Sequence, residues 1–576
     1  MAPRKLAVAV LVLLMGGPAP WSPSAFAQPQ PSSDQPPPAA ETQRLRGIID
    51  KDQTWSGTII ITDDLTIQDA TVTVSPGTTI EFAQAGPEHP PTLTVGSAAS
   101  ATGELKVLGT AQQPVTFRTH EGTNAGRVII NVRSRLIPSS PQALGSKPAA
   151  QPAVVPNEVT WRYVRFENLG HLQTKPGGGG TKTQVAEPAI AFNATGGAHT
   201  LQISECSFAK CCRLEVRAAE GAKVSITGNR FGDEKERVAI EVIAGEGDKG
   251  TGSLVVSGNT ASAAINVDGA ADIIENILVG VNAAIVLRNS GAAEAKICGN
   301  YVHNLAQEDD GRYCLNCEDP GALIDGNVLR GGTTCVLNGS KRVSGNVFIA
   351  ALHLTSKYVK SAHTHQLVGA LPPGATFERN LLLGPAYSML VPQPAALAKD
   401  TPPAKGPTII RHNLFDGFSD SNRAVHLNTA GRSSAPVAIL NNVFLRVTTL
   451  VYDEGKTENT LTYEDYNAIA PEQARRFDQV QIAGIKMGSA GWGAKDIQLP
   501  DIGSMQLSAV FKEPPGDFDD EISARKVSIS ELRRRLFAAY RPLVSSPLVR
   551  AGRGDSGSEE ASGPRPTIGP SEPGKE

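Results

Sequence analysis

Ile226-Thr227-Gly228-Asn229-Arg230-Phe231 carries the pattern that decides the fold of this chain, an Asn with an apolar residue three positions before it and another two positions after it. The pattern recurs nine times, at intervals of 17 to 34 residues, which is too irregular for a helical repeat. Such self-similarity is typical of a solenoid, in which each unit buries its apolar face against its neighbours. The nine positions are Asn229, Asn259, Asn276, Asn300, Asn327, Asn346, Asn380, Asn413 and Asn442.

The residues around each Asn indicate short strands joined by a sharp bend. Apolar and polar residues alternate, so that one face of each strand points into a narrow core. Asn tolerates a left-handed backbone, and five of the nine Asn residues have Gly immediately before them. Stacked at one corner, the Asn side chains can bond one another in a ladder, which avoids a burial cost of about 1–3 kcal/mol for each amide. The pattern therefore predicts an all-β solenoid, and the alternative is a β-sandwich in which Gly-Asn turns recur by chance.

The first 27 residues are typical of a secretory signal peptide. Arg4 and Lys5 form the positive start, residues 6–15 the apolar run, and Ala25-Phe26-Ala27 a small-x-small cleavage site, so we expect cleavage after Ala27. The apolar run is too short to span a bilayer. No other stretch predicts a transmembrane segment, and the mature protein is expected to be secreted, either periplasmic or extracellular.

The flanking segments and the composition exclude some classes of function. Residues 28–43 are rich in Pro, Gln and Ser and predict a linker, and residues 553–576 have hardly an apolar side chain and predict a disordered tail. The chain has 54 basic and 57 acidic residues, which excludes a strongly basic nucleic-acid binder. Aromatic residues make up only 5% of the chain, so no extended stacking platform for sugars is evident.

Residues upstream of the Asn repeat carry a family resemblance. Trp55-Ser-Gly57 is followed by Val72-Thr-Val-Ser-Pro-Gly-Thr-Thr-Ile-Glu-Phe82 and then by Pro114-Val-Thr-Phe117. These motifs resemble the opening coils of the secreted right-handed parallel β-helix proteins of the pectate-lyase-like superfamily. The resemblance implies a single-stranded right-handed parallel β-helix of about a dozen coils over residues 44–470.

Insertions and a closing segment complete the predicted domain. Residues 471–552 resemble the closing part of such proteins and predict a C-terminal coil or cap. Within them, Ser528-Ile-Ser-Glu531 is a capping box that opens a short helix, which we expect to help cover the end of the solenoid. Loop insertions are expected at residues 134–157, 171–187, 303–320, 353–374 and 391–407.

The resemblance implies contact with extracellular polysaccharide. Enzymes of this superfamily cut acidic polysaccharides as lyases, or as hydrolases with paired carboxylates. The hydrolase signature of Asn-Thr-Asp, Asp-Asp, Gly-His-Gly and Arg-x-Lys is missing from this chain, as is the lyase motif Trp-Ile-Asp-His. Two hypotheses therefore stay open, a polysaccharide lyase or glycoside hydrolase, and a non-catalytic carbohydrate-binding or surface-structural protein.

The candidate catalytic residues lie beside the Asn column. Asp325, Ser344, Glu378 and Arg411 each stand two positions before an Asn in successive coils, and His412 follows Arg411. If these side chains point outward, Asp325 and Glu378 lie two coils or about 10 Å apart, close to the spacing of an inverting carboxylate pair. The candidate set is thus Asp325, Glu378, Arg411 and His412. The alternative is that Glu378 and Arg411 form a cross-strand ion pair.

One insertion has the composition of a calcium site. Glu308, Asp309 and Asp310 supply hard oxygen ligands, so calcium is a possible cofactor, although the same residues could form an exposed turn. His363 and His365 are separated by one residue and could bind a transition metal, but no third ligand is evident.

The cysteines admit two interpretations. Cys298, Cys314, Cys317 and Cys335 could form a zinc site, but in an exported chain two disulfides are the more favoured prediction. The odd count of seven leaves at least one free thiol, for which Cys206 is the natural choice because it occupies the Asn column.

Overall fold

The structure is a computed structural model, and the residues that it describes lie within residues 41–576. The predicted signal peptide and nearly all of the predicted linker lie outside them. The described residues are 42–83, 90–96, 103–119, 125–133, 135–136, 154–155, 158–176, 182–195, 199–219, 221–232, 237–244, 253–288, 294–306, 313–319, 321–331, 335–337, 340–350, 366–369, 371, 374–384, 387–391, 406–418, 423–427, 436–453, 461–471, 474–478, 492–554 and 566–570.

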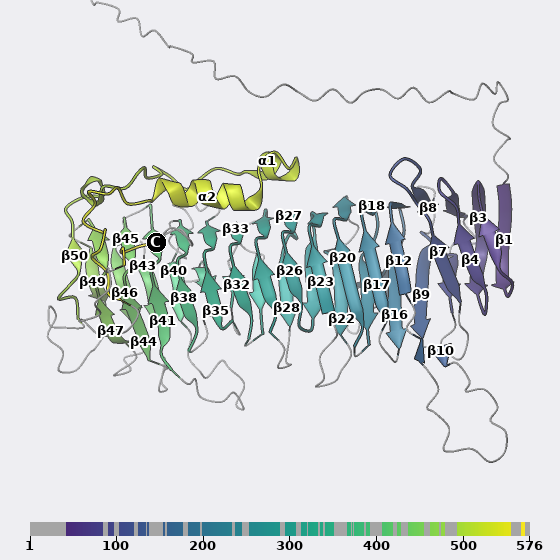
Figure 1. Cartoon of the computed structure of the whole chain (residues 1–576), viewed down its shortest axis with the longest axis horizontal. Coiled ribbons are helices and arrows are strands. Elements are labelled where there is room, and N and C mark those ends of the chain that lie inside the picture. The colour runs from purple at the N-terminus through teal and green to yellow at the C-terminus, as the bar shows by residue number, and fades with distance from the viewer. Residues whose placement is uncertain are drawn as a thin grey trace, which may run out of the picture. The chain divides into compact units, whose positions relative to one another are not determined.

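Parallel strands stack coil upon coil on three faces, which we name A, B and C (Figure 1). Each coil runs from face C through the Asn corner to face A and then to face B. The fold is therefore the right-handed parallel β-helix that the sequence predicts. The first strand β1 (Thr42–Ile49) pairs with β3 along faces A and B, and β3 bends from one face to the other.

Face A follows the Asn corner in each coil. Its strands are β3 (Thr58–Ile67), β5 (Thr79–Phe82), β8 (Val115–Thr119), β13 (Val164–Glu167), β18 (Ser207–Ala209), β21 (Arg230–Gly232), β24 (Thr260–Ala261), β27 (Ile277–Gly280), β30 (Tyr301–Asn304), β33 (Val328–Arg330), β36 (Val347–Ile349), β39 (Leu381–Leu383), β42 (Leu414–Asp416), β45 (Val443–Leu445), β48 (Ala468–Ala470) and β50 (Ile497–Gln498).

Face B carries the longer loops at its ends. Its strands are β6 (Thr92–Val95), β9 (Arg127–Arg133), β16 (Ile190–Thr195), β19 (Leu214–Ala218), β22 (Val238–Ala244), β25 (Ala264–Asp268), β28 (Ile285–Arg288), β31 (Leu315–Cys317), β34 (Cys335–Val336), β37 (Gln366–Gly369), β40 (Tyr387–Val391), β43 (Arg423–Leu427), β46 (Thr449–Asp453) and β49 (Arg475–Asp478).

Face C precedes the Asn corner and consists of a three-stranded sheet followed by a twelve-stranded one. The first sheet contains β2 (Gln53–Trp55), β4 (Thr71–Val74) and β7 (Glu104–Val107). The second contains β12 (Glu158–Arg162), β17 (Thr200–Ser204), β20 (Lys223–Thr227), β23 (Ser253–Ser257), β26 (Asp272–Ile274), β29 (Lys296–Cys298), β32 (Leu323–Asp325), β35 (Arg342–Ser344), β38 (Thr376–Glu378), β41 (Thr408–Arg411), β44 (Val437–Leu440) and β47 (Leu461–Asp465).

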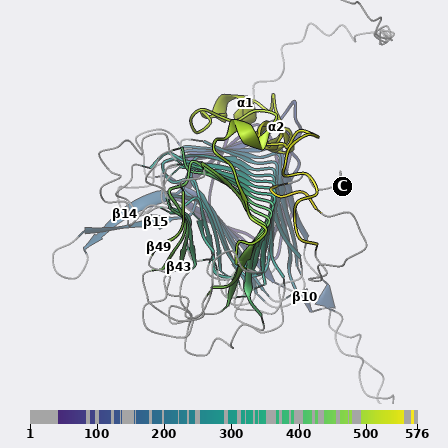
Figure 2. The same ribbon diagram turned by 90° about the vertical axis from the view of Figure 1, so that its left-hand side faces the viewer.

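Two antiparallel hairpins interrupt the coils. The hairpin of β10 (Arg135–Leu136) with β11 (Val154–Val155) falls in one predicted insertion, and that of β14 (His171–Pro176) with β15 (Lys182–Glu187) in another. Seen along the stack in Figure 2, the β14–β15 hairpin projects away from the coils.

At the Asn corner each coil turns through a left-handed residue followed by Asn. The five Gly residues at this position have φ between 62° and 66°, and the other four positions are also left-handed, with φ between 54° and 57°. Asn276 is typical, because its Nδ2 donates to Oδ1 of Asn300 at 3.0 Å and to the Val256 carbonyl at 2.9 Å. The backbone N–H of Asn276 donates to the same Oδ1 at 2.9 Å.

These bonds run without interruption from Asn229 to Asn442. Beyond the nine predicted residues, Asn442 donates to Asn467, whose Nδ2 donates to Glu464 at 2.8 Å. At the other end, the backbone N–H of Cys206 donates to Asn229 Oδ1 at 3.0 Å. Every buried amide in the column is therefore satisfied, which stabilises each coil relative to the next.

Apolar side chains fill the interior in columns that follow the strand register. Phe117, Phe166, Phe208 and Phe231 stack on successive coils, with ring centroids 5.4, 4.8 and 4.3 Å apart. All four are at most 4% exposed. Stacked rings of this kind add to the free energy gained by burying apolar area.

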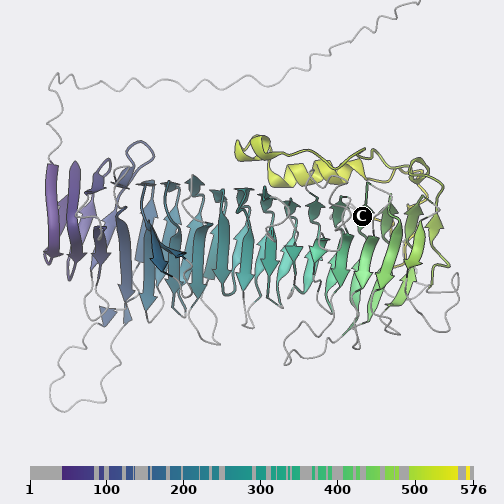
Figure 3. The same ribbon diagram turned by 180° about the vertical axis from the view of Figure 1, so that it is seen from behind.

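The C-terminal segment, residues 499–554, lies along the outside of face A. It contains the 3-10 turn Gly503–Met505, α1 (Asp519–Ser523) and α2 (Ile529–Ala539), and both helices follow the strands from β27 to β45 in Figures 1 and 3. The capping box forms as predicted, with Ser528 Oγ accepting from Glu531 N at 3.1 Å. We expected this helix to cover the end of the solenoid, but it covers the side, because face A is apolar on its outer surface there.

The residue that follows each Asn points outward and explains why face A is apolar on its outer surface. From β27 onward this position is occupied by Ile277, Tyr301, Val328, Val347, Leu381, Leu414, Val443 and Ala468, all of them buried. On β21 and β24 the same position is Arg230 or Thr260. The apolar strip packs against residues such as Leu532, Leu536 and Phe537 of α2.

Part of the predicted disordered tail is also ordered. Residues 566–570 pack on the solenoid, with Ile568 fully buried and its N–H donating to the Leu548 carbonyl at 3.0 Å. Backbone hydrogen bonds also hold it, because Gly569 N donates to the Asn441 carbonyl at 2.9 Å and Gly552 N to the Pro566 carbonyl at 2.9 Å. Within the part of the chain that the structure describes, no helix is both long and apolar enough to cross a membrane.

Candidate functional site

The predicted catalytic column is in register but its side chains are engaged in structural contacts. Asp325, Ser344, Glu378 and Arg411 lie opposite one another on four successive coils of face C. Glu378 is only 3% exposed, and its carboxylate pairs with Arg411 at 2.8 Å and with Arg342 at 2.6 Å. Burial would raise the pKa of Glu378, but the two arginines outweigh it and the pKa is lowered. A carboxylate held ionised in this way does not suit a general acid.

The remaining candidates, Asp325 and His412, also make contacts with neighbouring residues of the solenoid. Asp325 is exposed and its Oδ1 accepts a 2.6 Å hydrogen bond from the Ser344 hydroxyl. His412 is 6% exposed at a left-handed corner, and its Nε2 lies 3.3 Å from Nδ2 of Asn441. His412 thus faces the next corner. The structure therefore favours the ion pair over the catalytic group for this column.

The candidate metal residues lie outside the described residues. This holds for Glu308, Asp309 and Asp310 and also for His363 and His365. In the described part of the chain, no group of three His, Cys, Asp or Glu side chains could hold a metal ion.

The cysteine prediction needs correction. Cys298, Cys314 and Cys317 form no disulfide in the described part of the chain, so the predicted disulfides do not involve them. Both Cys314, directly before β31, and Cys317, at its end, are buried in the core. Cys314 Sγ donates to the Arg330 carbonyl at 3.0 Å, and burial raises the pKa of both thiols to about 12. The side chain of Cys335 lies outside the described residues.

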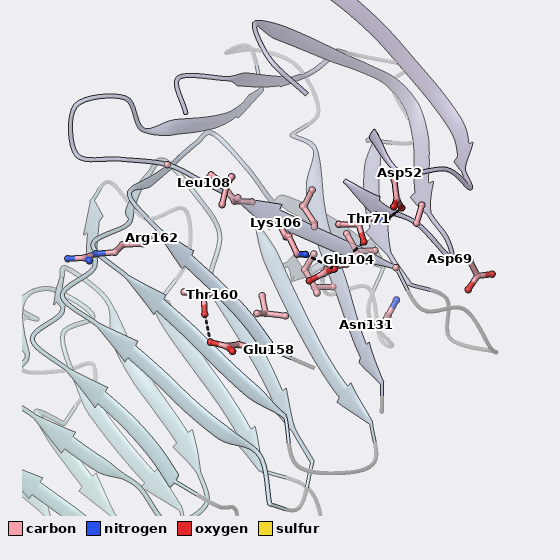
Figure 4. A pocket seen from close by; sticks show the side chains of 18 residues that line it. Asp52, Asp69, Thr71, Glu104, Lys106, Leu108, Asn131, Glu158, Thr160 and Arg162 are labelled. Carbon is pink, nitrogen blue, oxygen red and sulfur yellow. Dashed lines mark hydrogen bonds and ion pairs between the residues drawn. The ribbon is translucent and has the colours of Figure 1, made fainter. Parts of the chain in front are cut away.

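A hollow of about 890 Å³ on face C is the candidate functional site (Figure 4). It lies where the three-stranded sheet ends at β7 and the twelve-stranded sheet begins at β12. No backbone ladder joins these two strands in the described residues, although β4 pairs with β7 and β12 with β17. Since strands alternate the direction of their N–H and C=O groups, half of those on β7 point toward the hollow.

The two strands converge at one end of the hollow. A Cβ at Gly109 would lie 2.5 Å from the Tyr163 carbonyl oxygen, so only Gly permits this approach. At the other end the strands separate, and outward side chains line the opening. The first wall presents Glu104 and Lys106, and the second presents Glu158, Thr160 and Arg162 (Figure 4).

Hydrogen bonds position several of these side chains. Oε2 of Glu104 accepts from the Thr71 hydroxyl at 3.1 Å and lies 3.3 Å from Nζ of Lys106. Thr160 donates to Oε1 of Glu158 at 3.1 Å. Each carboxylate keeps further acceptor positions, and the Lys106 ammonium and the hydroxyl oxygens of the two threonines can bond a ligand.

Carboxylates outnumber cations around the hollow. Four acidic residues line it, Asp52, Asp69, Glu104 and Glu158, against two basic ones, Lys106 and Arg162. Asn131 from β9 completes the lining, with its Nδ2 donating to the Gly96 carbonyl at 3.1 Å. The charged part of the lining is net acidic, and apolar side chains such as Val95, Val107 and Ile130 also line the hollow.

The sequence interpretation missed this site. Its signal is the outward alternation Glu104-x-Lys106-x-Leu108 before the predicted insertion at 134–157 and Glu158-x-Thr160-x-Arg162 after it. The two runs are separated by a full coil and the insertion, so only the stacking of the coils brings them together.

Comparison with known proteins adds no function. No family model matches the chain, and no curated protein matches it. Among solved structures, the crystal structure of pectate lyase Pel9A matches over 87% of this chain and 88% of that chain, with 12% identity and a TM-score of 0.23. Both are parallel β-helices. The strand register described above establishes the fold of this chain independently.

Proposed function

We propose that this protein is an exported polysaccharide-binding β-helix, and that its binding site is the hollow between β7 and β12. The observation that carries the proposal is a hollow of about 890 Å³ whose walls present carboxylate, ammonium, hydroxyl and amide groups. This volume lies within the range of about 300–1,000 Å³ typical of ligand sites. A chain of sugar hydroxyl groups, which both donate and accept, is complementary to such a lining.

The charge of the hollow favours a neutral polysaccharide over a uronate polymer. Four carboxylates against two cations would repel a polyanion unless a bound cation screened them. Export rests on the sequence expectation of a signal peptide cleaved after Ala27.

Binding without cleavage is the form of the proposal that the contacts support. The predicted catalytic carboxylate Glu378 is paired with two arginines, and Asp325 is bonded to Ser344. The competing hypothesis, a lyase or glycoside hydrolase, would need the carboxylates of the hollow to act instead.

The test measures binding and cleavage together. Purified protein is titrated by calorimetry with neutral polysaccharides (glucan, xylan, galactan) and with polygalacturonate and alginate, while reducing ends and ultraviolet absorbance are followed. We expect binding to at least one neutral polymer, no new reducing ends, and about tenfold weaker binding for Glu158→Gln and Lys106→Gln. Lys223→Gln is the matched control, because Lys223 is an exposed lysine on β20 of the same face and does not line the hollow.

Each other outcome overturns a defined part of the proposal. Binding to none of the polymers removes polysaccharide binding. Stronger binding of uronate polymers removes the preference for neutral chains. New reducing ends, with or without ultraviolet absorbance, would establish a lyase or hydrolase.

A further inference from the structure

A second cavity, of about 350 Å³, lies between the C-terminal segment and the Asn corners of the solenoid. It is distinct from the hollow on face C, since the two share no lining residue. One wall comes from the corners of the coils that contain Gly258, Gly299 and Gly326. The other comes from the residues around the start of α2.

At three of its corners, glycine leaves the first wall without a side chain. Gly258, Gly299 and Gly326 have φ of 62°, 62° and 66°, as every corner requires, and the missing Cβ leaves backbone as the floor of the cavity. Glu275 occupies the equivalent corner position in the coil between Gly258 and Gly299, and its carboxylate stands beside the glycines. Asp325 lines the same wall from the end of β32.

Two arginines reach from the C-terminal segment across the cavity to the corner wall. Arg525 follows α1 and its Nη2 donates to the Gly258 carbonyl at 3.2 Å. Arg533 lies on α2, where its Nη1 donates to the Gly345 carbonyl at 3.4 Å. Each guanidinium carries five N–H donors, so most of them stay available to a ligand.

No ion pair joins either carboxylate to either guanidinium in the described part of the chain. Two carboxylates and two arginines therefore line one cavity without pairing, and Arg533 Nη1 and Asp325 Oδ1 both lie beside the Gly345 corner. The first turn of α2, with Ile529 and Ser530, also lines the cavity and adds the partial positive charge of a helix N-terminus on the arginine side. Apolar contact surface in the cavity comes from Ile277, Ile522 and Ile529.

We infer that this cavity binds a small zwitterion, a free α-amino acid, with its carboxylate toward Arg525 and Arg533 and its ammonium group toward Glu275 and Asp325. A cavity with separated charges of both signs is complementary to a ligand that carries both charges a short distance apart. A simple anion would face Glu275 and Asp325 uncompensated, and a simple cation would face the arginines. The volume, at the lower end of the range for ligand sites, suits a molecule of this size.

Calorimetry with the full chain tests the inference. The probes are the standard free amino acids, followed for each binder by its amide, which lacks the carboxylate, and its N-acetyl derivative, which lacks the ammonium group. We expect at least one free amino acid to bind, and both derivatives to bind about tenfold more weakly or not at all. Arg533→Gln and Glu275→Gln should each weaken binding by a similar factor.

The control variant is Arg534→Gln. Arg534 neighbours Arg533 on α2 but pairs with Glu531 at 2.8 Å and does not line the cavity, so this variant should bind like the unmodified chain. Thermal unfolding of each variant shows that loss of binding does not reflect loss of the fold.

A second readout uses Cys298. It lines the cavity and is half-buried, whereas the other five described cysteines are buried. A bound amino acid should slow maleimide labelling of Cys298, followed by peptide mass spectrometry. Binding of no amino acid, or equal binding of the N-acetyl derivative, would overturn the inference while leaving the polysaccharide proposal untouched.

Discussion

The Tyr540 hydroxyl donates a 2.9 Å hydrogen bond to Oδ2 of Asp416, although 124 positions separate the two residues. Nε of Arg446 donates to the other oxygen of the same carboxylate at 2.8 Å, and Arg446 also bonds the Phe511 carbonyl at 2.7 Å. Asp416 is fully buried on face A. This cluster pins the C-terminal segment to the solenoid, and a second cluster at the other end of the segment joins Asp519 to Tyr301 at 2.7 Å.

The first prediction concerns this anchor. Tyr540→Phe removes the hydroxyl but keeps the ring, so Oδ2 of buried Asp416 loses one hydrogen-bond donor. We expect it to lower the free energy of unfolding by about 1.5–3 kcal/mol, the usual contribution of a hydrogen bond to a charged group. Urea unfolding measures the loss, and hydrogen exchange should quicken in α2 more than in the coils. Unchanged exchange in α2 would show that the C-terminal segment is held by its apolar contacts alone.

The second prediction separates two roles of glycine. Gly326→Ala and Gly299→Ala each place a side chain at a left-handed corner, which costs about 1–2 kcal/mol. At Gly326 the new Cβ would also lie 2.6 Å from Nη1 of Arg533, whereas at Gly299 it would lie 3.6 Å from Cγ of Glu275, an ordinary contact.

Gly326→Ala should therefore be the more destabilising of the two. The difference should disappear when Arg533→Ala is present in both chains, which a double-mutant cycle measures. A difference that survives would mean that Arg533 does not pack on Gly326.

The third prediction concerns the Asn column. Asn327→Ala removes an amide that donates to Asn346 Oδ1 at 2.9 Å and accepts from both N–H groups of Asn300 at 2.9 Å. Because these partners stay buried, we expect a loss of about 2–4 kcal/mol in urea unfolding. Asn316→Ala is a control on face B, where the side chain makes an exposed bond to Glu318. Equal losses for the two variants would contradict a special contribution from the column.

The fourth prediction is a pH dependence. The pKa of Glu378 is lowered below its ordinary value of 4.5, because Arg411 and Arg342 outweigh the effect of burial. A carboxyl group with a depressed folded-state pKa stabilises the fold above its unfolded pKa and loses that contribution as the pH falls through the folded pKa. We expect Glu378→Gln to cost about 1–3 kcal/mol near neutral pH.

The cost should shrink as the pH falls from about 4.5 toward the lower folded-state pKa. Urea unfolding at a series of pH values checks this. The same variant should leave polysaccharide binding unchanged. A loss of binding with normal stability would show that Glu378 takes part in binding.

The fifth prediction concerns the thiols. Burial raises the pKa of Cys206, Cys314 and Cys317 to about 12 each, so almost no thiolate is present at pH 8. In the folded protein these three thiols should react slowly with Ellman's reagent, and the denatured, unreduced protein should release at least the six thiols that form no disulfide in the structure. Fewer than six would mean that a disulfide forms in the isolated protein.

Much of the fold could be predicted because its determinants are local and repeated. The apolar residues around Asn229 recur with each coil. Every repeat therefore predicts again which residues face the core and where the chain turns. The register then follows, since Asp325, Ser344, Glu378 and Arg411 do lie opposite one another. The register could not predict how the side chains pair, because Arg342, two residues before Ser344 of the predicted column, takes part in the Glu378 cluster.

The sequence by itself determined the stacked coils, since alternation of apolar residues and a left-handed corner before each Asn act over a few residues. Only the tertiary structure decided where the surface is hollow, because Glu104 and Glu158 become neighbours through an unpaired junction between two sheets. It also decided that the C-terminal segment covers face A, since Asp519 and Tyr540 find their partners more than a hundred positions away. Contacts of that kind depend on which coils lie beside each other, and no local sequence pattern predicts them.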